Sequence, residues 1–187
     1  MARHGMPGRS GRLRAGGPRL RPTQSRVRDA LFNTLGARVQ GMRVLDLFAG
    51  SGALGLAALA YGAAEVVFVE RDQRLAEGIR ALLAKEGWTT HAEVWRRDTA
   101  AAVRELGTRR RLFDLVVLDP PYGEGWIPRT LRAVRTAGVL APGGLVVAEG
   151  HWRDRPETGP GFVRRREARY GETVLWYYDA ESGGEQA

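Results

Sequence analysis

The sequence contains no cysteine and, among its 29 basic residues, a single lysine, Lys85. Without cysteine, a disulfide framework and a thiolate zinc site are excluded, as is the covalent route to methylation at carbon 5 of a pyrimidine. The three histidines, His4, His91 and His151, share no metal-ligand spacing, so no metal is predicted.

Long hydrophobic runs are also missing. The most apolar stretch, residues 53–69, is interrupted by Gly62 and Glu65 and changes from helical to strand periodicity, which argues against a membrane span. The arginine-rich N-terminus has no apolar segment of the kind that a secretory signal needs. The 187 residues are 43% hydrophobic and fit one globular domain with a sizeable core. We expect a cytoplasmic protein, monomeric and without membrane contact.

Positive charge is concentrated at the N-terminus. Residues 1–28 contain eight arginines and no acid, whereas the other 21 basic and 21 acidic residues cancel, so this segment carries the whole net charge of +8. A segment rich in glycine, proline and arginine cannot form a core, and basic arms commonly bind polyanions. We predict that residues 1–20 form a flexible basic arm that binds RNA; the simpler alternative is a solubilising tail. The arginines expected at the RNA are Arg12, Arg14, Arg19, Arg21, Arg26 and Arg28.

Apolar runs and helical segments alternate along residues 21–179, which we expect to be the catalytic domain. Strands are predicted at about 43–48, 65–70, 92–96, 113–118 and 144–149, and helices at about 53–61, 74–86, 99–107 and 127–137. Residues 161–170 and 172–178 flank Gly171 as an antiparallel hairpin, and residues 180–187 are expected to be a disordered tail. The alternation predicts an α/β fold with a mostly parallel sheet, whose ligands bind beyond the carboxyl ends of the strands.

A glycine-rich turn follows the first predicted strand. Its Gly50-x-Gly52-x-x-Gly55 spacing satisfies the dinucleotide fingerprint, and Glu70 ends the next strand where it can accept bonds from ribose hydroxyls. An NAD-dependent oxidoreductase is therefore one interpretation. The carboxylate of Asp46 within the first strand, and the lack of a second mononucleotide-binding half, favour S-adenosylmethionine instead. The residues expected to hold this cofactor are Asp46, Phe48, Ala49, Gly50, Ser51, Gly52, Glu70, Arg71, Asp98 and Thr99.

A second motif, Asp119-Pro120-Pro121-Tyr122, follows the apolar run 112–118. An exocyclic amine on a nucleobase is a poor nucleophile, because its lone pair is conjugated with the ring, and it needs acceptors that orient its hydrogens. The Asp119 carboxylate and the Pro120 carbonyl can be these acceptors, held in place by the proline rings. Tyr122 can stack on the base, and Trp126 is a candidate for lining the same pocket. We predict Asp119, Pro120, Pro121 and Tyr122 as the catalytic residues of an amino-methyltransferase.

The chain resembles a known family, the small bacterial 16S ribosomal RNA guanine-N2 methyltransferases. The resemblance covers about residues 11–178, and it rests on Arg21-Pro22-Thr23 with residues 26–33, Leu45 to Gly55, Val69-Glu70 and Asp119 to Tyr122. It implies a Rossmann-like class I methyltransferase fold with seven mostly parallel strands and a C-terminal antiparallel hairpin. It also implies S-adenosylmethionine as methyl donor and the N2 amine of a guanine as acceptor, in 16S ribosomal RNA or a partly assembled small ribosomal subunit.

Tyr122 departs from the family, whose members commonly have phenylalanine at this place. Tyrosine makes the turn match DNA adenine-N6 methyltransferases as well, although those enzymes usually carry a target-recognition region for which this chain has little room. A DNA adenine-N6 methyltransferase therefore stays open as an alternative, beside the oxidoreductase and a non-catalytic RNA-binding protein.

Overall fold

The sheet has the predicted α/β topology. A computed structural model describes residues 22–181, in which seven strands follow the order β3-β2-β1-β4-β5-β7-β6. The first five strands are parallel, and β7 lies antiparallel between β5 and β6. The strands are β1 Arg43–Leu47, β2 Glu65–Val69, β3 Ala92–Trp95, β4 Phe113–Leu118, β5 Leu140–His151, β6 Phe162–Tyr170 and β7 Thr173–Ala180.

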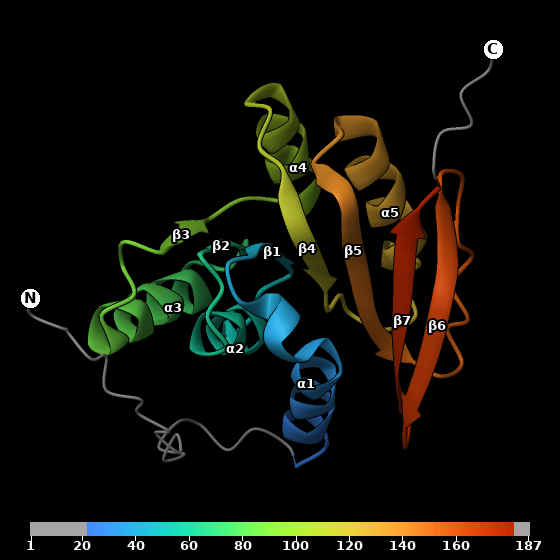
Figure 1. Cartoon of the computed structure of the whole chain (residues 1–187), viewed down its shortest axis with the longest axis horizontal. Helices are drawn as coiled ribbons and strands as arrows, with labels where there is room; N and C mark the ends of the chain where they lie inside the picture. Colours follow the sequence, from blue (N-terminus) through green and yellow to red (C-terminus); the bar gives the residue numbers. More distant parts are fainter. Residues whose placement is uncertain (1–21, 182–187) are drawn as a thin grey trace, which may run out of the picture.

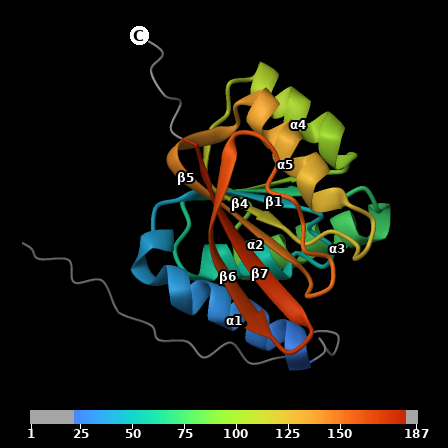
Figure 2. The same cartoon turned by 90° about the vertical axis from the view of Figure 1, so that its right-hand side faces the viewer.

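Helices cover both faces of this sheet. One face packs against α4 and α5, and the other against α1, α2 and α3, as Figures 1 and 2 show. Side chains alternate along the central strand accordingly: Leu45 and Leu47 lie in the α4–α5 core, whereas Val44 lies in the opposite core. The helices are α1 Pro22–Leu35, the 3-10 turn η1 Gly36–Val39, α2 Ala53–Ala60, α3 Gln73–Glu86, α4 Thr99–Thr108 and α5 Trp126–Ala137.

This topology confirms the predicted fold class and removes the support for a dinucleotide fold. The order of the strands across the sheet reverses between β1 and β4, which opens a crevice at the carboxyl ends of these two strands. A second mononucleotide-binding half would need a sixth parallel strand beyond β5, but the antiparallel β7 occupies that position. The glycine turn therefore belongs to a fold with one mononucleotide-binding half instead of two.

The structure departs from the predicted boundaries chiefly in β5 and β7. Strand β5 begins at Leu140 rather than 144, with a register shift against β4 between Phe113 and Leu115. Strand β7 includes Ala180, and the Glu181 amide donates to the Gly161 carbonyl at 3.0 Å, so pairing extends into the segment predicted as a tail. The proposed arm, residues 1–20, and residues 182–187 lie outside the described part of the chain.

Within residues 22–181, no helix combines the length and the apolar composition that crossing a membrane requires. In the same residues no group of three or more histidine or acidic side chains could hold a metal ion.

Candidate active site

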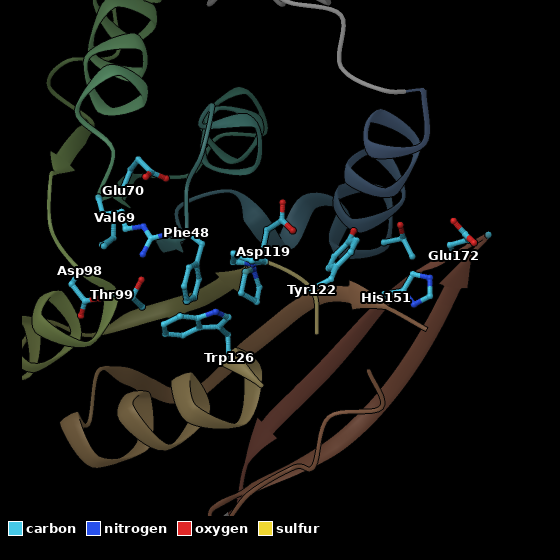
Figure 3. A pocket seen from close by; sticks show the side chains of 15 residues that line it. Phe48, Val69, Glu70, Asp98, Thr99, Asp119, Tyr122, Trp126, His151 and Glu172 are labelled. Carbon is cyan, nitrogen blue, oxygen red and sulfur yellow. The ribbon is translucent and has the colours of Figure 1, made fainter. Parts of the chain in front are cut away.

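The two sequence motifs meet at one edge of the sheet, beyond the carboxyl ends of β1, β2 and β4. A cavity of about 700 Å³ opens there, and Figure 3 shows Glu70 and Asp98 at one end, with Tyr122 and His151 at the other. The predicted residues that line it are Phe48, Glu70, Arg71, Asp98, Thr99, Asp119, Pro120, Pro121 and Tyr122.

A smaller cavity of about 220 Å³ lies beside the glycine turn. Phe48 and Asp119 line both cavities, so the two spaces adjoin at these two residues. The smaller cavity is also lined by Glu149 and Arg28, neither of which was predicted from the sequence to lie there. The predicted residues that line it are Asp46, Phe48, Ala49, Gly50, Ser51 and Asp119.

The glycine turn is held in a conformation that few residues adopt. Phe48 has a φ of 63°, in the left-handed region that residues other than glycine rarely occupy. Phe48 contacts Trp126 edge-on, with 5.7 Å between ring centroids. Gly52 lines neither cavity; it precedes α2 with a φ of 80°. Gly55 must be glycine because a Cβ there would overlap the ring of Phe68.

Two carboxylates at the strand ends hold neighbouring backbone amides: Glu70 holds the glycine turn, and Asp98 caps α4. Glu70 accepts the Gly50 amide at 2.7 Å through Oε2 and the Asp72 amide at 2.8 Å through Oε1. Each carboxylate oxygen has a second lone pair, so Glu70 can still accept a ribose hydroxyl, as the sequence predicts. Asp98 begins α4 by accepting the amides of Ala100 and Ala101 through Oδ1.

Asp46 is the most deeply buried charged side chain of the site, at 1% exposure. Its Oδ2 accepts the Gly55 amide at 2.8 Å, but Oδ1 is buried without a partner within residues 22–181. Burial raises the pKa of Asp46 from 3.8 to about 7; the Gly55 hydrogen bond opposes this rise, and the charges of Asp119 and Glu70 add to it. An unpartnered carboxylate oxygen at a cavity is an acceptor prepared for a cationic group.

Two further carboxyl groups, Asp119 and Glu149, stand beside Asp46. Burial raises the pKa of Asp119, and burial together with the Asp119 charge raises the pKa of Glu149, which the Tyr122 side chain lowers in part. Glu149 is 5% exposed. It was not predicted from the sequence, although the signal was present: Glu149 is an acid at the end of the apolar run 145–148, as Glu70 is at the end of its own strand.

The structure places the other candidates as follows. Arg28, predicted to bind RNA, lines the smaller cavity beside the glycine turn. Its guanidinium pairs with the Asp29 carboxylate at 2.9 Å. Arg26 is exposed on α1. Trp126 lines the larger cavity, as predicted, and the hairpin turn 171–173 closes its far end, which no pattern in the sequence indicated. Outside the described residues lie Arg12, Arg14, Arg19 and Arg21.

A family described as "Conserved hypothetical protein 95" matches residues 8–179. The chain belongs to this family. A relative, "Putative rRNA methyltransferase YlbH" of Bacillus subtilis (strain 168), is 37% identical over 164 residues, which are 87% of this chain and 89% of the relative. "Ribosomal RNA small subunit methyltransferase D" of Escherichia coli (strain K12) is 33% identical over 171 residues, 90% of this chain and 83% of the relative.

Solved structures agree with this family. "Putative methyltransferase yhhF from Escherichia coli" superimposes with a TM-score of 0.77 at 29% identity, covering 84% of this chain and 87% of that one. A distant structure, "SMU.776, a putative methyltransferase complexed with SAH", has a TM-score of 0.66 at 15% identity over 83% of this chain and 49% of that one. The distant match shows the fold alone, which is that of class I methyltransferases. The family resemblance predicted from the sequence is confirmed.

Proposed function

We propose that this protein transfers a methyl group from S-adenosylmethionine to the exocyclic N2 amine of a guanine in 16S ribosomal RNA. The observation that carries the proposal is the position of Asp119, which lines both the small cavity beside the glycine turn and the large cavity beside Tyr122. The small cavity would take the amino acid part of the donor, and the large cavity would take its ribose and adenine at the Glu70 end and the base at the Tyr122 end, so the methyl group and the base would meet at this carboxyl group. The names of the rRNA methyltransferase relatives support the coarser part of this proposal, methyl transfer to ribosomal RNA.

The residues at the cofactor end fit S-adenosylmethionine. Glu70 has lone pairs for the ribose hydroxyls, Asp98 and Thr99 line the end expected to take the adenine, and Asp46 offers its unpartnered Oδ1 to the ammonium of the amino acid part. When bound, the cofactor supplies an electrophilic methyl group on a positively charged sulfur. The buried carboxyl groups of Asp46 and Glu149, with the partly buried one of Asp119, match the two positive charges of this molecule better than they match the anionic pyrophosphate of NAD.

The residues at the substrate end act on the amine. The Asp119 carboxylate and the Pro120 carbonyl accept its two hydrogens, which orients the nitrogen and stabilises positive charge that develops on it. The proline rings restrict the backbone, so both acceptors are in place before the base arrives. Tyr122 is 47% exposed and can stack on the base, while Phe48 and Trp126 exclude water from the centre of the cavity.

The choice of guanine rests on the family resemblance, because these acceptors suit any exocyclic amine. Adenine N6 in DNA is the competing acceptor, and RNA binding without catalysis is the competing role. We further propose that residues 1–20 bind phosphates of the substrate RNA, with Arg26 on the exposed side of α1. A cytoplasmic location and a monomeric state stay predictions.

Product analysis tests this proposal directly. The protein is incubated with methyl-labelled S-adenosylmethionine and, separately, with naked 16S rRNA, partly assembled small subunits and duplex DNA. The nucleic acid is then digested and the labelled nucleoside identified, with Asp119→Ala as the inactive control. Labelled N2-methylguanosine from either RNA substrate is the expected result. The amounts of this nucleoside formed from naked rRNA and from partly assembled subunits show which substrate is preferred. Labelled N6-methyl-2′-deoxyadenosine from DNA, or no labelled nucleoside at all, would refute the proposal.

A further inference from the structure

A cluster of aromatic and basic side chains lies at the rim of the large cavity, next to Tyr122. We call it the rim cluster and define it as His151, Trp152, Arg153 and Arg169. His151 lines the cavity, and its ring centroid is 6.1 Å from that of Tyr122 and 5.8 Å from that of Trp152. Arg153 and Arg169 lie over the Trp152 ring, with their guanidinium carbons 5.1 Å and 4.7 Å from its centroid.

Non-local pairing assembles this cluster. His151 ends β5 opposite Thr173, the first residue of β7, and the Trp152 amide donates to the Glu172 carbonyl at 2.9 Å. Asp154 accepts the His151 amide at 3.0 Å, which closes the turn after β5. Arg169 comes from the end of β6, and its Nε donates to the Gly171 carbonyl at 2.8 Å. These bonds hold the backbone of the rim cluster and the Arg169 side chain beside the cavity.

The charge of the cluster is not neutralised by its neighbours. Within residues 22–181, no carboxylate lies within ion-pair distance of the Arg153 or Arg169 guanidinium, not even that of Glu172, which shares the rim. Not every stacked arginine is unpaired: Arg109 lies 5.0 Å from the Trp95 centroid and pairs with Glu105 at 2.5 Å, whereas Arg129 and Arg166 stack on Trp126 and Tyr177 with no carboxylate of residues 22–181 within ion-pair distance. The two rim arginines are therefore available for an external anion.

His151 adds a hydrogen-bond donor. The Arg153 amide lies 3.2 Å from His151 Nδ1, and because an amide can only donate, Nδ1 must accept. The neutral ring then carries its proton on Nε2. The rim thus combines aromatic faces, one ring N–H and two uncompensated guanidinium groups beside a pocket for a base. Single-stranded nucleic acid is recognised by this combination, with bases stacking on aromatic or guanidinium planes and phosphates pairing with arginine.

We propose that the rim cluster binds the nucleotide adjacent to the methylated base on a single-stranded stretch of substrate RNA. The inference rests on the proposed function and deepens it: Tyr122 stacks on the target base, His151 and the stacked arginines hold the neighbouring base, and the guanidinium groups pair with the phosphates between them. A base that enters the cavity must unstack from its neighbours in the strand. Binding of the adjacent nucleotide at the rim stabilises the strand in this unstacked conformation.

Steady-state methylation and RNA binding by rim variants test this subsite. The variants are His151→Ala, Trp152→Ala, Trp152→Phe and Arg153→Ala combined with Arg169→Ala. The matched control is Arg109→Ala, which also removes an arginine from a tryptophan face. Arg109 follows the C-terminal end of α4, whereas the cavity lies at the N-terminal end of this helix, at Thr99. Measurements are kcat, KM for RNA at saturating S-adenosylmethionine, cofactor Kd, and binding of a labelled single-stranded RNA by anisotropy at several salt concentrations.

We expect Trp152→Ala to raise KM for RNA on the order of tenfold, with Trp152→Phe recovering most of the loss, because Trp152 positions the two arginines on which the neighbouring base stacks, and one such stacking interaction is typically worth roughly five- to a hundredfold in affinity. The double arginine variant should lower the salt dependence of log Kd by roughly 0.7 for each phosphate that it no longer binds. Cofactor Kd, and all values for Arg109→Ala, should stay at wild-type levels.

Two results would overturn the subsite. One is an unchanged RNA affinity and KM in all rim variants that melt at the wild-type temperature. The other is a loss confined to partly assembled subunits and absent on naked RNA, which would assign the cluster to a ribosomal protein. If the wild-type protein methylates no RNA, the proposed function fails, and anisotropy still decides the subsite: weaker RNA binding by the rim variants supports it, and equal binding refutes it.

Discussion

Replacing the buried Asp46 by asparagine should make the protein without cofactor more stable at alkaline pH. The pKa of Asp46 is raised in the folded state from 3.8 to about 7, chiefly by burial. A carboxyl group with a raised folded-state pKa contributes stability that is fully present below the unfolded pKa and is lost as the pH rises through the folded pKa. A rise of about three pKa units corresponds to about 4 kcal/mol of lost stability at pH values well above 7.

Asparagine keeps the shape of Asp46 but has no proton to lose. Its amide oxygen can still accept the Gly55 amide, while its NH2 group takes the place of the unpartnered Oδ1. We expect the free energy of unfolding of Asp46→Asn, minus that of the wild type, to increase by about 3 kcal/mol between pH 5 and pH 8.5. Asp119 and Glu149 also have raised pKa values, so stability should still fall with pH in both proteins.

Urea denaturation at pH 5, 6, 7 and 8.5 without cofactor measures this difference. Asp114→Asn is a suitable control because the pKa of Asp114 is lowered by its bonds to Arg43, so that its removal should not improve stability at pH 8.5. A difference between Asp46→Asn and wild type that stays constant over this pH range would refute the raised pKa of Asp46 in the folded state. The variant should also bind S-adenosylmethionine more weakly, because the cofactor ammonium loses its charged partner.

Three further predictions concern other parts of the chain. Asp119→Ala should bind cofactor nearly normally but lose on the order of a hundredfold or more in kcat, as expected for a preorganised transition-state interaction; unchanged kcat would refute that role. Gly55→Ala should lose about 1–3 kcal/mol in urea denaturation because its Cβ overlaps the Phe68 ring, whereas Gly78→Ala, with nothing within 4 Å of its Cβ, should gain about 0.5–1 kcal/mol. Removing residues 1–20 should weaken RNA binding and reduce its salt slope by roughly 0.7 for each phosphate that the arm binds in the full chain, without changing cofactor affinity; equal slopes would make the arm a mere tail.

Local patterns in the sequence were sufficient to predict most of the fold. Period-two and period-3.6 spacing of apolar residues is set by neighbours within one element, so strands and helices were placed to within a few residues. The largest difference is the start of β5, where Leu140 pairs with Phe113 of β4 and the residues up to Gly144 fall in a register shift that no local pattern encodes. The two motifs were also predicted to meet, because carboxyl ends of parallel strands share one edge of the sheet.

The sequence by itself therefore determined the fold class, the family and the residues of the two motifs. Only the tertiary structure showed that Glu149 joins Asp46 and Asp119 around one cavity, because that requires β5 beside β4 and β4 beside β1. The same holds for the rim cluster: His151 meets the turn at Thr173 through antiparallel pairing of β5 with β7. The raised pKa values of the cavity carboxyl groups and the rim cluster both depend on groups that are distant in sequence. Packing of the whole domain, and no local spacing, decides which strands become neighbours.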